Sequence, residues 1–118
     1  MAASVIWVKG RSAEESLIDF AEVAISALGL TDVQERQSSN FRDGHYYAGV
    51  HDGSDVELYF FDDVGREGYL FEVHVDPCDA THAETLALLL ARRGRFCFVP
   101  TGAWYLQSWD GQGTAYAP

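Results

Sequence analysis

The chain has 118 residues, the usual length of one domain, and its hydrophobic content of 47% is too high for a disordered chain. Its formal net charge of −10 argues against direct binding to nucleic acid or to an anionic membrane surface, since both carry negative charge. No apolar run approaches the roughly 20 residues of a transmembrane helix, and no basic segment precedes the N-terminal apolar run as in a signal peptide, so we expect one cytoplasmic domain.

The first thirty residues predict a strand followed by a helix. Val5–Val8 is a short apolar run typical of a strand. Ser12 and Glu15 have the spacing of a capping box, which predicts that a helix begins at Ser12. Apolar side chains then recur at helical spacing: Leu17, Phe20, Ala21, Ala24 and Leu28. Gly29 is expected to end the helix, because glycine readily adopts the left-handed conformation found there.

The middle of the chain predicts an antiparallel meander. The polar passage from Gln34 to Asp43 is expected to contain a short strand that leads into a loop. Three alternating segments then predict strands: His45–His51, Asp55–Phe61 and Tyr69–Val75. Asp52-Gly53 is a typical hairpin turn, and residues 62–68 form a second turn region. Strands joined by such short turns pair with their neighbours in the sequence.

A second helix and a further strand follow. Thr81 and Glu84 predict another capping box, and the apolar helical face consists of Ala83, Leu86, Ala87, Leu89 and Leu90. Gly94 is expected to end this helix and Arg95–Val99 to form a strand in which Cys97 lies in the core. Both cysteines, Cys78 and Cys97, are expected to be reduced in the cytoplasm.

The C-terminal tail carries three large aromatic residues, Trp104, Tyr105 and Trp109. They are expected either to pack in the core or a last strand, or to anchor an interface if they are exposed. Together the predicted elements indicate an α+β fold with a mainly antiparallel sheet, a central three-stranded meander, and two helices packed on one face.

Most of the net charge comes from one segment. Between Asp43 and Asp79 the chain has ten carboxylates and a single base, Arg66, which gives this segment a formal charge of −9. The acids are Asp43, Asp52, Asp55, Glu57, Asp62, Asp63, Glu67, Glu72, Asp76 and Asp79. Because like charges repel one another in a compact chain, a positively charged partner is the expected reason for this concentration.

Strand alternation predicts which side chains of the meander face away from the helices. The core-facing sets are Val56, Leu58 and Phe60, and Tyr69, Phe71, Val73 and Val75. The opposite face is expected to carry His45, Tyr47, Gly49, His51, Asp55, Glu57, Tyr59, Phe61, Leu70, Glu72, His74 and Asp76. That face is either a solvated surface with cross-strand aromatic pairs or a binding face with aromatic anchors among carboxylates.

No catalytic motif stands out. The four histidines lack the spacing of a compact metal site, and there is no nucleophile elbow, P-loop or dinucleotide-binding glycine motif. We therefore expect no enzymatic activity and no cofactor. In the basic run Arg92-Arg93-Gly94-Arg95, two arginines complement the helix dipole, and the third is expected to form an intramolecular tie to the acidic segment; a phosphate site is the alternative.

Four short runs resemble a pattern in small uncharacterised bacterial proteins, some of which are immunity proteins of contact-dependent inhibition or polymorphic toxin systems. The runs are Glu35–Phe41, Gly44–Tyr47, Phe61–Asp63 and Tyr69–Phe71. The resemblance spans about a third of the chain, residues 35–76. It implies a small, acidic, cytoplasmic antitoxin that occupies or occludes the active site of a cognate toxin, which is frequently a basic nuclease.

The charge and the resemblance lead to one hypothesis, an immunity-type inhibitor of a basic toxin with a nuclease domain. The residues expected to complement the toxin's charge are Asp52, Asp55, Glu57, Asp62, Asp63, Glu67 and Glu72. The expected anchors are Tyr47, Tyr59 and His74. The alternatives are a small metal-dependent enzyme that uses the histidine and carboxylate face, and a homo-oligomeric structural module.

Overall fold

The computed structural model describes residues 3–37, 44–60, 68–102, 104, 108 and 110–118. These residues contain two helices and seven strands. In chain order they are β1 (Ser4–Lys9), α1 (Leu17–Leu28), β2 (Thr31–Gln37), β3 (His45–His51), β4 (Ser54–Phe60), β5 (Tyr69–Asp76), α2 (Ala80–Ala91), β6 (Cys97–Pro100) and β7 (Gly113–Tyr116). No helix in the described part of the chain is long and apolar enough to cross a membrane.

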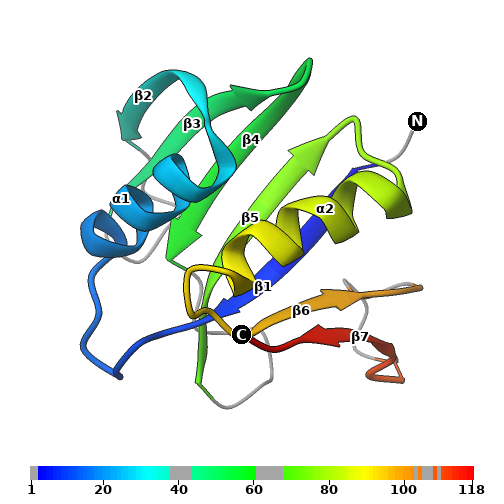
Figure 1. Cartoon of the computed structure of the whole chain (residues 1–118). Helices are drawn as coiled ribbons and strands as arrows, with labels where there is room; N and C mark the ends of the chain where they lie inside the picture. The colour runs from blue at the N-terminus through cyan, green and yellow to red at the C-terminus, as the bar shows by residue number, and fades with distance from the viewer. Residues whose placement is uncertain (1–2, 38–43, 61–67, 103, 105–107, 109) are drawn as a thin grey trace.

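All seven strands form one antiparallel sheet in the order β2-β3-β4-β5-β1-β6-β7. The strands from β2 to β5 are neighbours in both sequence and space, and β1 lies between β5 and β6 (Figure 1). Both helices cover the same face of the sheet (Figure 1). The predicted α+β architecture and its central meander, β3-β4-β5, are therefore confirmed.

The main core lies between the helices and the sheet. It contains the predicted inward sets Val56, Leu58 and Phe60 of β4 and Phe71, Val73 and Val75 of β5. Phe20 of α1 stacks on Phe71, with ring centroids 4.3 Å apart and planes 6° apart. Tyr69 was wrongly assigned to this core and Leu70 to the other face. The pairing of β1 with β5 shifts between Val8 and Lys9, so that Leu70 packs on the main core and Tyr69 on the opposite face.

A smaller apolar cluster covers part of the sheet face opposite the helices. Val5 and Trp7 of β1 and Phe98 of β6 are buried there, with Tyr69 and Trp104 packed against them. Packing of the C-terminal aromatics is therefore confirmed for Trp104. Tyr105 and Trp109 lie outside the described residues.

Both helices begin at residues other than the predicted caps. The N-cap of α1 is Ser16, whose side chain accepts a hydrogen bond from the Asp19 amide, four residues after the predicted Ser12. The N-cap of α2 is Asp79, which accepts a 2.7 Å hydrogen bond from the His82 amide. Gly29, at a φ of 63°, ends α1 as predicted. The sequence pattern did not distinguish these starts, because several nearby side chains have the chemistry of a cap.

We expect Ser16→Ala to lower the free energy of unfolding by about 1 kcal/mol, because it removes the acceptor for an orphan amide of α1. Ser12→Ala is the matched control and should have a smaller effect, since Ser12 lies before the helix and is exposed. Urea unfolding of both variants measures the difference. A larger loss for Ser12→Ala would place the start of the helix where the sequence pattern predicted it.

The two outer strands were the least well predicted. β2 begins at Thr31, earlier than expected, and all seven of its residues are exposed along the edge of the sheet. β7, at the other edge, was not predicted at all, because Gly113-Thr-Ala-Tyr116 lacks a strong apolar pattern. The predicted turn at 62–68 lies mostly outside the described residues.

Candidate functional site

The candidate site is the sheet face that α1 and α2 leave uncovered over β3, β4 and β5, which we call the open face. Its residues are Tyr46, Ala48, Val50, Asp55, Glu57, Tyr59, Glu72 and His74. The pairing of β4 with β5 brings its central residues together, since Glu57 lies directly opposite His74 and Tyr59 lies directly opposite Glu72. Facing residues on antiparallel strands project to the same side, so four predicted binding residues form one cluster.

Tyr59 and Glu57 form the polar centre of the open face. The Tyr59 hydroxyl donates a hydrogen bond to Glu57 Oε1, and His74 Nδ1 lies 3.9 Å from the same oxygen. The Tyr46 ring meets the Tyr59 ring edge-on, with centroids 5.8 Å apart. Burial, the bond to Glu57 and nearby negative charge raise the pKa of Tyr59 well above its ordinary value. The phenol therefore remains a hydrogen-bond donor that orients Glu57.

Glu72 is much less accessible than its predicted role as a surface acid implies. The residue is 7% exposed, and Trp7 Nε1 donates a 3.2 Å hydrogen bond to its Oε1. Burial raises the pKa of Glu72, and the Trp7 hydrogen bond and the charge of His74 oppose this shift only in part. Glu72 is thus largely hidden from a partner, while the side chain of Glu57, 35% exposed, is the more accessible carboxylate.

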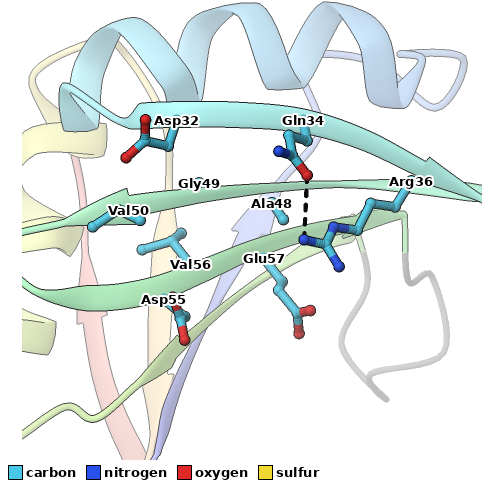
Figure 2. A pocket seen from close by; sticks show the side chains of 9 residues that line it. All are labelled: Asp32, Gln34, Arg36, Ala48, Gly49, Val50, Asp55, Val56 and Glu57. Atoms are coloured by element: carbon cyan, nitrogen blue, oxygen red, sulfur yellow. Dashed lines mark hydrogen bonds between the residues drawn. The ribbon is translucent and has the colours of Figure 1, made fainter.

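Beside this cluster the open face forms a hollow of about 330 Å³ over β2, β3 and β4 (Figure 2). Its acidic lining comes from Asp32, Asp55 and Glu57, and the small side chain of Ala48 lies in its floor. Arg36 also lines it and donates a 3.3 Å hydrogen bond to Gln34 Oε1 (Figure 2). The hollow therefore combines three carboxylates with one cation and is less uniformly acidic than the sequence predicted.

The expected orientation of β3 was wrong. Tyr47 lies opposite Leu58 and Gly49 opposite Val56, so His45, Tyr47, Gly49 and His51 project to the helix side of the sheet. There the Tyr47 hydroxyl donates a 2.9 Å hydrogen bond to Glu35, and burial together with this bond raises the pKa of Tyr47. A shift of one residue exchanges the two faces of a strand, and the mixed composition of β3 does not distinguish them.

Of the other predicted binding residues, one lies in a turn and three are not described by the structure. Asp52 is exposed in the β3–β4 turn, with φ values of 49° there and 82° at Gly53, as expected for this type of hairpin turn. Asp62, Asp63 and Glu67 lie outside the described residues. Of the ten predicted residues, the open face therefore brings together Asp55, Glu57, Tyr59, Glu72 and His74.

The four histidines occupy three separate places. His45 lies beside Glu35, His74 beside Glu57 on the open face, and His51 beside His82 at the start of α2. Within the described ranges, no group of three or more His, Cys, Asp or Glu residues has the arrangement of a metal site. The predicted alternative of a metal-dependent enzyme required His45, His51 and His74 to share one sheet face with carboxylates. In the structure, His45 and His51 project to the helix side and His74 lies on the open face.

The predicted internal tie of Arg95 exists, but to another acid. Arg95 forms a buried two-pronged ion pair with Glu15, which lies in the loop before α1 and outside the acidic segment. Arg95 also donates a 3.3 Å hydrogen bond to the Lys9 carbonyl. This arginine holds three segments of the chain together.

Sequence reasoning missed several residues of the site. Tyr46 was missed because the side chains of β3 were assigned to the wrong faces of the sheet. Three residues of β2 were missed because this strand was expected to start later: Asp32, Gln34 and Arg36. Trp7 was taken only as part of an apolar strand, and its bond to Glu72 joins residues 65 positions apart.

Comparisons with protein-family models, with curated proteins and with solved structures found no match to this chain.

Proposed function

We propose that the chain is an immunity-type inhibitor whose open face binds a positively charged protein, a basic bacterial toxin with a nuclease domain. The observation that carries this proposal is one cluster on the sheet face that the helices leave uncovered: Tyr59 donates a hydrogen bond to Glu57, His74 lies beside Glu57, and the Tyr46 ring packs edge-on against Tyr59. Oriented carboxylates beside half-buried aromatic rings match what a Lys- and Arg-rich surface recognises.

The proposed inhibitor would compete with nucleic acid for the basic side chains of the toxin. A nuclease needs basic side chains around its substrate groove to neutralise phosphates. Carboxylates presented on a rigid sheet can bind those same side chains without the entropic cost of ordering a loop. The net charge of −10 would also accelerate the encounter with a cationic partner. Self-association through this face is disfavoured, because two-fold symmetry would bring like charges together.

The first test is a pull-down of the tagged protein co-expressed with the product of the adjacent gene, at low and at high salt. The proposal predicts capture of a basic protein in near-equimolar amount, with slower association at high salt. Failure to capture a basic partner at either salt concentration would count against the inhibitor function.

Charge reversal then locates the interface. We expect Glu57→Lys to weaken binding by a few kcal/mol, about 2 or more, because it places a cation at the centre of the contact. Asp55→Lys, at an exposed position near the rim, should mainly slow association. Binding kinetics measured against the captured partner separate the two effects.

Glu84→Lys is the matched control, since it makes the same charge change at an exposed position on α2, in the helical layer. It should leave the dissociation rate unchanged. Equal losses for Glu57→Lys and Glu84→Lys would show that net charge matters and that the open face does not.

A further inference from the structure

Two histidines far apart in sequence meet at one end of the sheet. His51 is the last residue of β3, and His82 lies in the first turn of α2. His51 Nδ1 lies 2.8 Å from His82 Nε2, the ring centroids are 5.0 Å apart, and both residues are half-buried. Neither ring makes another hydrogen bond within the part of the chain that the structure describes.

This separation suits a shared metal ion. Metal–imidazole bonds of about 2.0–2.1 Å put two adjacent nitrogens about 2.9 Å apart on a square-planar centre and about 3.3 Å apart on a tetrahedral one. The 2.8 Å between His51 and His82 is closest to the square-planar value. To bind one ion in place of the shared proton, both rings must turn so that the lone pairs, which now lie along the hydrogen bond, converge on the ion.

The charge around the pair also favours a cation. Asp52 follows His51 in the β3–β4 turn, and Asp79 caps α2 three residues before His82. These two carboxylates, close to the histidines along the chain, favour a bound divalent ion over a site without them.

We propose that His51 and His82 form a binding site for a divalent transition metal, with Cu²⁺ or Ni²⁺ preferred over Zn²⁺. The protein supplies two imidazole ligands, and water completes the coordination. The ring that now donates its N–H must carry that proton on its far nitrogen, either His51 Nε2 or His82 Nδ1, so a neutral pair releases no proton on binding. This site is independent of the open face and of the proposed inhibition.

The test uses the untagged full-length protein, because a histidine tag would bind the same metals. Calorimetric titration with Cu²⁺ should show about one ion per chain, while Mg²⁺ and Ca²⁺, which prefer oxygen ligands, should not bind at this site. His51→Gln and His82→Gln should each abolish this binding. The matched controls His45→Gln and His74→Gln, which remove the other two histidines, should retain it.

A second measurement on the unaltered protein guards against variants that fail to fold. In imidazole ¹H–¹⁵N spectra, Zn²⁺ should shift the ring signals of His51 and His82 and leave those of His45 and His74 in place. Absence of Cu²⁺ binding by the wild-type protein, binding that survives both His51→Gln and His82→Gln, or equal loss in His74→Gln would overturn the proposal.

Discussion

Replacing Arg95 with alanine is expected to lower the free energy of unfolding by about 3–5 kcal/mol, because it leaves the Glu15 carboxylate buried without its cation. The Glu15 and Arg95 side chains are only 1% and 4% exposed. One of the two hydrogen bonds of the pair measures 2.6 Å, and Arg95 also lies over the ring of Phe20. Urea unfolding followed by circular dichroism measures the loss.

Arg93→Ala is the control for Arg95→Ala, since Arg93 is exposed just after α2 and should change stability by about 0.5 kcal/mol or less. The double replacement Glu15→Leu with Arg95→Met should recover much of the loss, because two apolar side chains need no charge partner. Equal effects of Arg95→Ala and Arg93→Ala would contradict the burial of the pair.

The pair also predicts the direction of the pH dependence. Burial acts to raise the pKa of Glu15, but the hydrogen bonds from Arg95 and the Arg11 amide, with the two arginine charges, bring it below its ordinary value of 4.5. A carboxyl whose pKa is lower in the folded state stabilises the fold above its unfolded pKa and ceases to do so as the pH falls through the folded value. The wild-type protein should therefore lose stability in acid more steeply than the double variant that carries Glu15→Leu and Arg95→Met, as unfolding at several pH values would show.

Replacing Phe71 with alanine should cost about 3–5 kcal/mol of unfolding free energy, because it opens a cavity at the centre of the main core. Phe71 is fully buried, stacks on Phe20 and meets the Phe60 ring edge-on at 5.4 Å. It therefore connects α1 to two strands of the sheet. Thermal and urea unfolding both measure the change.

The matched control for Phe71→Ala is Phe96→Ala, because Phe96 is 49% exposed. Removing that ring opens no cavity and should cost about 0.5 kcal/mol or less. If the two phenylalanine variants had similar midpoints of unfolding, the position of the core between α1 and the sheet would be wrong.

Strong local patterns made most of the fold predictable. The alternation of Val56, Leu58 and Phe60 identified an inward strand face, and the Asp52-Gly53 dipeptide identified the hairpin that joins β3 to β4. The same alternation placed Asp55 and Glu57 at successive outward positions of β4. These features depend on neighbouring residues, whose chemistry can be read directly along the chain.

The candidate site was only partly predictable, because its composition depends on which alternate side chains of each strand face the helices. β3 has tyrosines at both Tyr46 and Tyr47, and either could have faced the helices. Pairing with Leu58 places Tyr47 on the helix side and leaves Tyr46 beside Tyr59. Residue types alone did not distinguish these two arrangements.

The amino-acid sequence by itself determined the fold class, the central meander and the concentration of acids, because these follow from periodicity, turn residues and charge. Only the tertiary structure decided that Glu15 pairs with Arg95, that Glu72 is buried and accepts a hydrogen bond from Trp7, and that His51 meets His82. Each of these contacts joins residues more than 30 positions apart. Such contacts depend on how the strands and helices pack, and no local pattern along the chain encodes them.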